Sequence, residues 1–272
     1  MSLNYRVAPD ARRHCISHSS PRKNGGQYVD CTNRPQANER TCVSCSVANA
    51  EFASNLHHAH TRERDVLDRA VVDHLTQANI LYLAAFRDGS IKIGTSTAHR
   101  KIKRWTEQGA WQVVEVATVT DGFGVRKLED LITEKLGIPQ SVAVKRKLHG
   151  MVNPLGPDQL TARLEPQVQQ VHDVIDSATA SLELEDDVEK SSTPWTFPNS
   201  DREIWQGLHP YPAKLDGGVH HVEVQRMCGR LAVLSRPGSS DRFVADLGQL
   251  YGVELDLGSY VPDQLAVQDS LF

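Results

Sequence analysis

Four of the five cysteines of this chain lie within its first 45 residues, at Cys15, Cys31, Cys42 and Cys45. The last two form the string CVSC, in which two thiolates on one tight turn can bind one edge of a tetrahedral zinc ion. Cys15 and Cys31 can supply the other two ligands. The segment PRKNGGQYVDCTNRPQANERT around them is polar and rich in turn-forming residues, so it has few side chains with which to form a core. We therefore expect a closed, structural zinc site that stabilises residues 1–60.

Two alternatives to this zinc site stay open. His18 follows Cys15 in the string CISH and is a competing ligand. The cysteines can also be reduced thiols, or CVSC can be a redox pair, although redox motifs normally follow a strand and open a helix in a thioredoxin-like unit, a pattern absent here. The histidines of LHHAH (His57, His58 and His60) indicate the entry to a helix rather than a second metal site.

A hairpin that leads into a basic helix is predicted further along the chain. ILYLAAF (80–86) has the composition of a buried strand, RDGS supplies a turn with Asp88 and Gly89 at its tip, and IKIG returns as the second strand. AHRKIKRWTEQG then predicts a short helix that ends at Gly109. The hairpin and this helix place several cations beside a glycine.

The elements around this hairpin extend it into a compact unit. Residues 61–79 space their apolar side chains as one face of an amphipathic helix. Residues 111–119 alternate as a strand does, and 124–137 predict a helix closed by Gly137. The order over residues 80–137 is therefore β-β-α-β-α, which indicates an α+β fold.

Charge is distributed unevenly along the chain, whose net formal charge is −4. Residues 1–150 carry 22 basic and 15 acidic residues, whereas 151–272 carry 8 and 19. A polyanion would therefore meet the first half, although two independently solvated surfaces would give the same count. No apolar run approaches the roughly 18 residues of a membrane span, and the N-terminus lacks the apolar core of a signal peptide. We expect a cytoplasmic protein without a membrane partner.

The β-β-α-β-α order, with particular residues in it, resembles the GIY-YIG endonuclease fold. The family motif Gly-Ile-Tyr on the first strand is similar to ILY here, with Tyr82 at the tyrosine position. The motif Tyr-Ile-Gly on the second strand is similar to KIG, from Lys92 to Gly94. The arginine on the first helix is matched by Arg104 in RW, and the glutamate on a later helix by Glu129 in KLEDLI.

This resemblance implies metal-dependent cleavage of a phosphodiester. Tyr82 would orient or deprotonate the attacking water, Glu129 would hold a divalent Mg or Mn ion, and Arg104 would stabilise the transition state. Gly94 would let the backbone approach the substrate closely. The residues expected to bind phosphate or nucleic acid are Lys92, Gly94, Ser96, Arg100, Lys103 and Gln108.

The chain also departs from the family pattern. Lys92 stands in place of the second tyrosine, and Gln108 stands where many of these nucleases have a histidine. A glutamine cannot act as a general base. Asn153 is the candidate for the late asparagine of the family, and Arg100 is an alternative to Arg104 as phosphate ligand. These departures favour a catalytically inactive protein that binds zinc and nucleic acid as an alternative function.

A narrower resemblance rests on the string KIG…RW…QGA. It is similar to an uncharacterised bacterial family, known only as a domain of unknown function, that combines cysteines of this spacing with a GIY-YIG-like core and a C-terminal β region. The narrow resemblance covers most of the chain, whereas the nuclease-fold resemblance covers only residues 80–137.

The sequence after residue 140 indicates few functional features. SVAVKRKLHG (141–150) is a second basic cluster, which can extend a nucleic-acid track or be a solvated loop. Residues 158–190 predict a helix with an interruption at Pro166, and 191–201 a turn-rich connector. From residue 203 on, short strands separated by glycine and proline predict a small antiparallel β region with Cys228 in its core. The final VQDSLF is expected to be a frayed terminus rather than a docking segment.

We thus expect four parts: a zinc-binding segment (1–60), a GIY-YIG-like α+β domain (61–150), a helix and connector (151–200), and a small β region (201–272). The leading function is a metal-dependent endonuclease, a phosphodiesterase that acts on DNA or RNA. A third possibility is an enzyme that reuses the fold on a small molecule, which the absence of a net basic charge favours.

Overall fold

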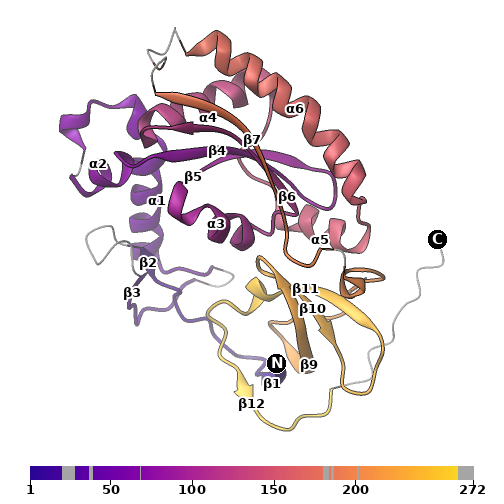
Figure 1. Cartoon of the computed structure of the whole chain (residues 1–272). Coiled ribbons are helices and arrows are strands. Elements are labelled where there is room, and N and C mark those ends of the chain that lie inside the picture. Colours follow the sequence, from indigo (N-terminus) through magenta and orange to yellow (C-terminus); the bar gives the residue numbers. More distant parts are fainter. Residues whose placement is uncertain are drawn as a thin grey trace.

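The fold was derived from a computed structural model, which describes residues 1–19, 28–36, 39–67, 69–179, 184, 187–200 and 202–262. Helices and strands are labelled in Figure 1. The helices are α1 Val43–His57, α2 Arg69–Leu75, α3 Lys101–Gln108, α4 Gly122–Leu136, α5 Val144–Val152 and α6 Pro157–Ala178. The strands are β1 Ser2–Val7, β2 His18–Ser19, β3 Tyr28–Val29, β4 Asn79–Ala85, β5 Ile91–Thr97, β6 Gln112–Val119, β7 Val188–Thr196, β8 His209–Pro210, β9 Gly218–Cys228, β10 Leu231–Ser235, β11 Arg242–Asp246 and β12 Asp256–Leu257.

A four-stranded antiparallel sheet in the order β5-β4-β6-β7 forms the centre of the molecule (Figure 1). Its first hairpin has the predicted turn, in which Gly89 has a φ of +82° that side chains with a Cβ rarely adopt. In the register of this hairpin Tyr82 pairs with Gly94. The predicted short helix and the predicted later helix are also present as α3 and α4, which end at Gly109 and Gly137 in the left-handed conformation.

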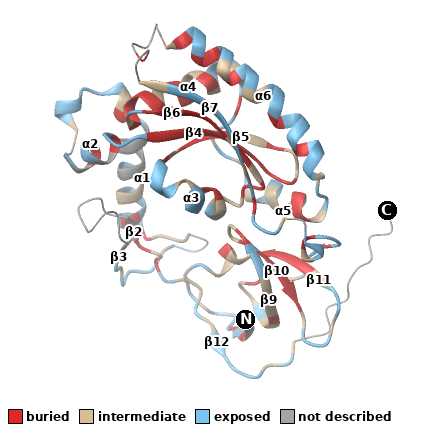
Figure 2. Ribbon diagram, viewed as in Figure 1, coloured by how far each residue is buried: buried red, intermediate tan, exposed pale blue. Residues whose placement is uncertain are grey.

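Helices cover both faces of this sheet, so every residue of β4 is buried (Figure 2). On one face, Leu81 and Leu83 pack in a cluster with apolar residues of α4 and α6, such as Leu128 and Leu164. On the other face, Tyr82 and Ala84 pack with Trp105 of α3. Because side chains alternate along a strand, Tyr82 must point to the α3 side. Tyr82 of β4 therefore lies on the face of the sheet that α3 covers, next to the helix that carries Arg104.

A second sheet of six strands has the order β12-β1-β9-β10-β11-β8. Strands β9, β10 and β11 form the antiparallel region predicted after residue 203, and Cys228 is buried as expected. The N-terminal strand β1 pairs along β9, with Tyr5 opposite His220. This long-range pairing brings the two ends of the described chain into one sheet, which no local pattern indicated.

The structure corrects two expected elements before and after the central sheet. Residues 61–79 do not form one helix: a short 3₁₀ turn (Arg64–Val66) precedes the seven-residue α2. Arg64 pairs with Asp121 at 2.8 Å and lies over the ring of Phe123 at 4.3 Å, which holds this segment against the start of α4. The basic segment 141–150 is not a loop, because Val144–Val152 forms α5.

Two further expectations, both between residues 158 and 201, were wrong. Helix α6 runs through Pro166 without interruption. Pro166 is exposed, so water can solvate the Ala162 carbonyl that lacks its helical donor. The connector expected at 191–201 is largely strand β7, which pairs with β6. Pro194 is tolerated there because β7 is an edge strand with a free side.

The terminal string VQDSLF lies outside the described residues. Among the helices that the structure describes, none is both long and apolar enough to cross a bilayer.

Candidate functional site

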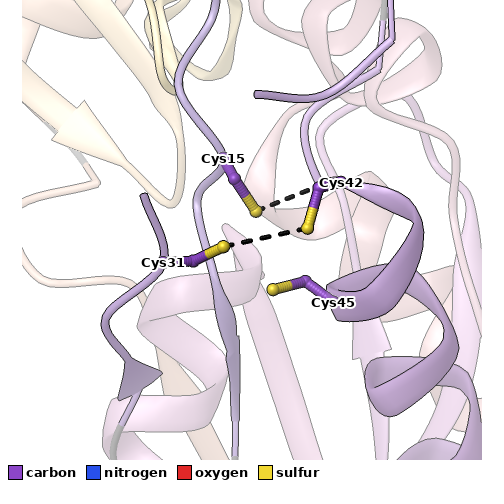
Figure 3. Close-up of side chains that lie close together, drawn as sticks. All are labelled: Cys15, Cys31, Cys42 and Cys45. Carbon is purple, nitrogen blue, oxygen red and sulfur yellow. Dashed lines mark hydrogen bonds between the residues drawn. The ribbon is translucent and has the colours of Figure 1, made fainter. Parts of the chain in front are cut away.

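The four cysteines predicted as metal ligands converge on one point (Figure 3). Their sulfur atoms all lie within 4.8 Å of one another, and those of Cys31 and Cys42 are 3.8 Å apart. Four sulfurs bound to zinc at about 2.3 Å are separated from one another by about 3.8 Å in a tetrahedral site. Cys15, Cys42 and Cys45 are buried, and Cys31 is partly exposed. The cluster has the size and the donor set of a closed site and could hold a metal ion such as zinc.

Backbone N–H groups surround the sulfurs of this cluster. Cys42 directly precedes α1 and Cys45 lies in its first turn, where the helix dipole favours negative sulfur. The N–H groups of Ser17 and Cys42 donate to Sγ of Cys15 at 3.3 and 3.2 Å. The Cys45 N–H is the main cause that lowers the pKa of Cys42 to about 6, whereas burial raises the pKa of Cys45. These donors support thiolates, the form in which cysteine binds metal.

The histidines near the cluster are placed outside it. Nδ1 of His18 lies 3.2 Å from Sγ of Cys45, so His18 contacts a candidate ligand but is not part of the close group. Nε2 of His60 lies 3.0 Å from Oδ2 of Asp130, and His58 is exposed. Within the described ranges, the four cysteines form the sole group of three or more potential ligands close enough to share an ion.

Tyr82 forms the centre of the second candidate site. It is fully buried, its ring meets Trp105 edge-on at 5.7 Å, and its hydroxyl donates to Oε1 of Gln108 at 3.1 Å. Burial raises the pKa of Tyr82 to about 12, so the hydroxyl is neutral near pH 7. A Cβ on Gly94 would lie 2.7 Å from this hydroxyl, so glycine is required at the paired position. The glycine thus makes room for the ring and hydroxyl of Tyr82.

Lys92 and Glu129 lie beside Tyr82 and are both buried. Nζ of Lys92 donates to the carbonyl of Gln140 at 3.0 Å, and burial lowers the pKa of Lys92 to about 8. Glu129 accepts a hydrogen bond of 2.7 Å from Arg126, and burial raises its pKa against the opposing charges of Arg126 and Lys92. Burial therefore destabilises the charged form of both the Glu129 carboxylate and the Lys92 amine.

Arg104 reaches the same site from outside. It is exposed on α3, but its charge is close enough to offset part of the rise that burial causes in the pKa of Tyr82 and to add to the fall that burial causes in the pKa of Lys92. Arg104 and Glu129 also both affect the pKa of Lys92. The predicted residues that converge are therefore Tyr82, Lys92, Gly94, Arg104, Gln108 and Glu129.

Three of the predicted phosphate ligands form no hydrogen bond or ion pair with that group among the described residues. Arg100 is exposed, and Lys103 is exposed and lies 3.8 Å from Glu107. Oγ of Ser96 donates to the carbonyl of its neighbour Thr97. Asn153, the candidate asparagine, contacts His149 at the end of α5. These residues stay predictions that depend on a bound substrate.

Two side chains that organise this site were not among the predicted site residues. Arg126 holds Glu129 one helical turn away at spacing i, i+3, a pattern that a search for ion pairs on the helix 124–137 would detect. Lys101 pairs with Glu115 of β6 at 2.7 Å, which fastens the start of α3 to the sheet. That second pair joins elements by tertiary contact, so spacing alone carries no signal for it.

Comparison with known proteins identifies one family to which the chain is similar. A protein family described as "Protein of unknown function (DUF2797)" matches residues 6–216, a range that includes the four cysteines and both candidate sites. No curated protein and no solved structure matches the chain. Because the match covers well over half of the 272 residues, the chain belongs to the DUF2797 family of proteins of unknown function.

Proposed function

We propose that this protein is a GIY-YIG-like endonuclease that cleaves a phosphodiester bond in DNA or RNA, with a structural zinc ion in its N-terminal segment. The observation that carries this proposal is the convergence of the buried Tyr82, Lys92 and Glu129 beside the central sheet, with the exposed Arg104 of α3 close enough to affect the pKa values of Tyr82 and Lys92. The β-β-α-β-α order from β4 to α4 supports it. Such a combination of perturbed titratable groups is typical of active sites.

Each side chain has a role that its surroundings favour. The hydroxyl of Tyr82 is a neutral donor and acceptor that orients the attacking water. Lys92 in its neutral form accepts the proton of that water, because an amine with a pKa of about 8 is partly deprotonated near neutral pH. Arg104 binds the phosphate from the exposed side of α3 and stabilises the developing charge. Lys92 would therefore act as the general base. Gln108 cannot, although many of these nucleases have a histidine at its position.

Glu129 is the residue that would hold a divalent cation such as Mg²⁺ or Mn²⁺. A single protein carboxylate fits Mg²⁺, which commonly keeps several waters and shares substrate phosphates. The cation would supply positive charge at the phosphoryl oxygens and the leaving group. Burial raises the pKa of Glu129, and the charge of Arg126, 2.7 Å away, opposes that effect in part and favours the ionised carboxylate.

The zinc ion has a separate, structural role in this proposal. All four ligands are protein thiolates, so the site leaves no open position for a substrate. The metal would join Cys15, Cys31 and the start of α1, elements that share few apolar contacts apart from the cysteines themselves. It thereby stabilises the polar segment that precedes the central sheet.

A protein that binds nucleic acid without cleaving it is the second candidate. Two contacts favour it: the Tyr82 hydroxyl is occupied by Gln108, and the Glu129 carboxylate by Arg126. The decisive experiment incubates the purified protein with Mg²⁺ or Mn²⁺ and a panel of single- and double-stranded DNA and RNA. Cleavage by wild type that Glu129→Gln abolishes supports the nuclease. Binding without cleavage under every condition supports the second candidate.

A further inference from the structure

A cavity of about 230 Å³ lies where the end of α3, helix α5 and the β9–β10 hairpin meet. The hairpin packs closely on the end of α3, because a Cβ on Gly229 would lie 2.8 Å from the carbonyl oxygen of Glu107. The cavity is thus lined by two helices, by the residues that follow β4, and by the β9–β10 hairpin. Its volume is below the roughly 300–1,000 Å³ of drug-sized sites, so it fits only a small molecule.

Apolar and cationic groups share the lining of this cavity. Phe86, Val144, Met151 and Leu231 form the apolar part. The charged lining residues are Arg87, Lys147, Arg230 and Glu107. Arg230 is neutralised by a bidentate contact with Asp246, and Glu107 lies near Lys103.

Arg87 and Lys147 are the cations that remain without a carboxylate partner among the described residues. Arg87 is buried; it donates to the carbonyl of Trp205 at 2.8 Å and lies over the ring of Trp111. Its Nε is buried and has no hydrogen-bond partner in the described part of the chain. Lys147 donates to the carbonyl of Gln108 at 2.7 Å and lies 4.3 Å from the ring centre of Phe86.

Two such cations are costly without a counter-charge. Removing a cation from water is unfavourable unless an anion accompanies it. Burial accordingly lowers the pKa of Lys147 to about 8 and that of Arg87 to about 10. An anion in the cavity would restore the balance of charge beside Arg87 and Lys147.

We propose that this cavity binds a small organic oxyanion, a carboxylate or a phosphate ester, whose charged end is held by Lys147 and Arg87 and whose apolar body lies against Phe86, Met151 and Leu231. This site is distinct from the cleavage site proposed above, although Gln108 belongs to both: its side chain contacts Tyr82 and its carbonyl contacts Lys147. A carboxylate and a phosphate ester present the same acceptor oxygens, so the test separates them.

Titration calorimetry on the 272-residue chain uses three probes that share a phenyl ring: benzoate, phenyl phosphate and neutral phenol. We expect at least one anion to bind with a stoichiometry near one and about tenfold or more tighter than phenol, because hydrogen bonds to charged groups contribute that much. The tighter of the two anions identifies the chemical class. If neither anion binds more tightly than phenol, the proposal is wrong.

Variants locate the binding in the cavity. Lys147→Met keeps most of the apolar stem of the side chain but removes its charge, so anion affinity should fall by about tenfold or more. The control is Lys145→Met, at an exposed position of the same helix, which should change anion affinity by less than about twofold. Val144→Phe fills the cavity from its partly exposed wall and should abolish binding even if Lys147→Met fails to fold. Equal losses in the two lysine variants, or unchanged binding in Val144→Phe, would place the anion elsewhere and overturn the proposal.

Discussion

The Tyr82 hydroxyl on β4 donates a hydrogen bond of 3.1 Å to the side-chain oxygen of Gln108, the last residue of α3. This contact joins the middle of the central sheet to the helix that carries Arg104. The contact orients the phenol, whereas burial raises its pKa to about 12 and so keeps it neutral. Substitutions at this contact and around it distinguish a role in catalysis from one in binding or in the fold alone.

Tyr82→Phe removes the hydroxyl and leaves the ring in place. If Tyr82 orients water, the cleavage rate should fall by about 10²-fold or more while nucleic-acid affinity changes little. The lost hydrogen bond should lower the free energy of unfolding by about 0.5–1.5 kcal/mol. Single-turnover kinetics and denaturant unfolding measure the two effects. A loss of stability with an unchanged rate would assign Tyr82 to the core alone.

Glu129→Gln keeps the shape of the side chain and removes its charge. We expect cleavage to be abolished and nucleic-acid binding to be retained, since the amide cannot hold a divalent cation. The matched control is Glu134→Gln, an exposed position on the same helix, which should cleave as wild type does. Cleavage assays over a range of Mn²⁺ concentrations provide the measurement. Full activity in Glu129→Gln would exclude this carboxylate from metal binding.

Arg104→Ala tests the phosphate contact. Both affinity and rate should fall, and the slope of binding against salt concentration should decrease by about one phosphate contact. Arg226→Ala, an exposed arginine of β9, serves as the control for a general loss of positive charge. Salt-dependent binding titrations on one oligonucleotide compare the two. Equal behaviour of both variants would mean that Arg104 is a surface residue without a specific role.

The pH dependence separates two roles for Lys92. As a base it must be neutral, so the rate should rise by about tenfold per unit below the pKa of about 8 and level off above it. As a phosphate ligand it must be charged, so affinity should instead fall as the pH rises through the same value. Lys92→Arg keeps the charge but cannot deprotonate, and it should remove the rising limb. A rate profile that is flat from pH 6 to 9 in wild type would exclude Lys92 as the base.

Metal analysis tests the cysteine cluster. Purified protein should contain about one zinc per chain, and Cys42→Ser combined with Cys45→Ser should lose it and lower the thermal midpoint. Cys228→Ala, which removes a buried thiol distant in sequence from the cluster, should retain the metal. Zinc-free wild-type protein with the same midpoint as the metal-loaded form would contradict a structural role.

The local pattern of the sequence determined much of the central unit. Alternating or continuous apolar runs with glycine at their ends defined β4, β5, α3, β6 and α4, because these elements depend on periodicity and on turn residues that act over a few positions. The spacing of the cysteines likewise predicted their cluster, since thiols in a polar segment have few other uses.

Tertiary structure alone decided the remaining features. The pairing of β1 with β9 and of β7 with β6 joins segments distant in sequence, and the exposed, proline-containing β7 has no strand pattern of its own. The pKa values of Lys92 and Glu129 follow from burial, which depends on the helices that cover the sheet. The sequence therefore identified which residue types could act, whereas long-range packing determined their neighbours and their charge, because burial and register are properties of the assembled fold.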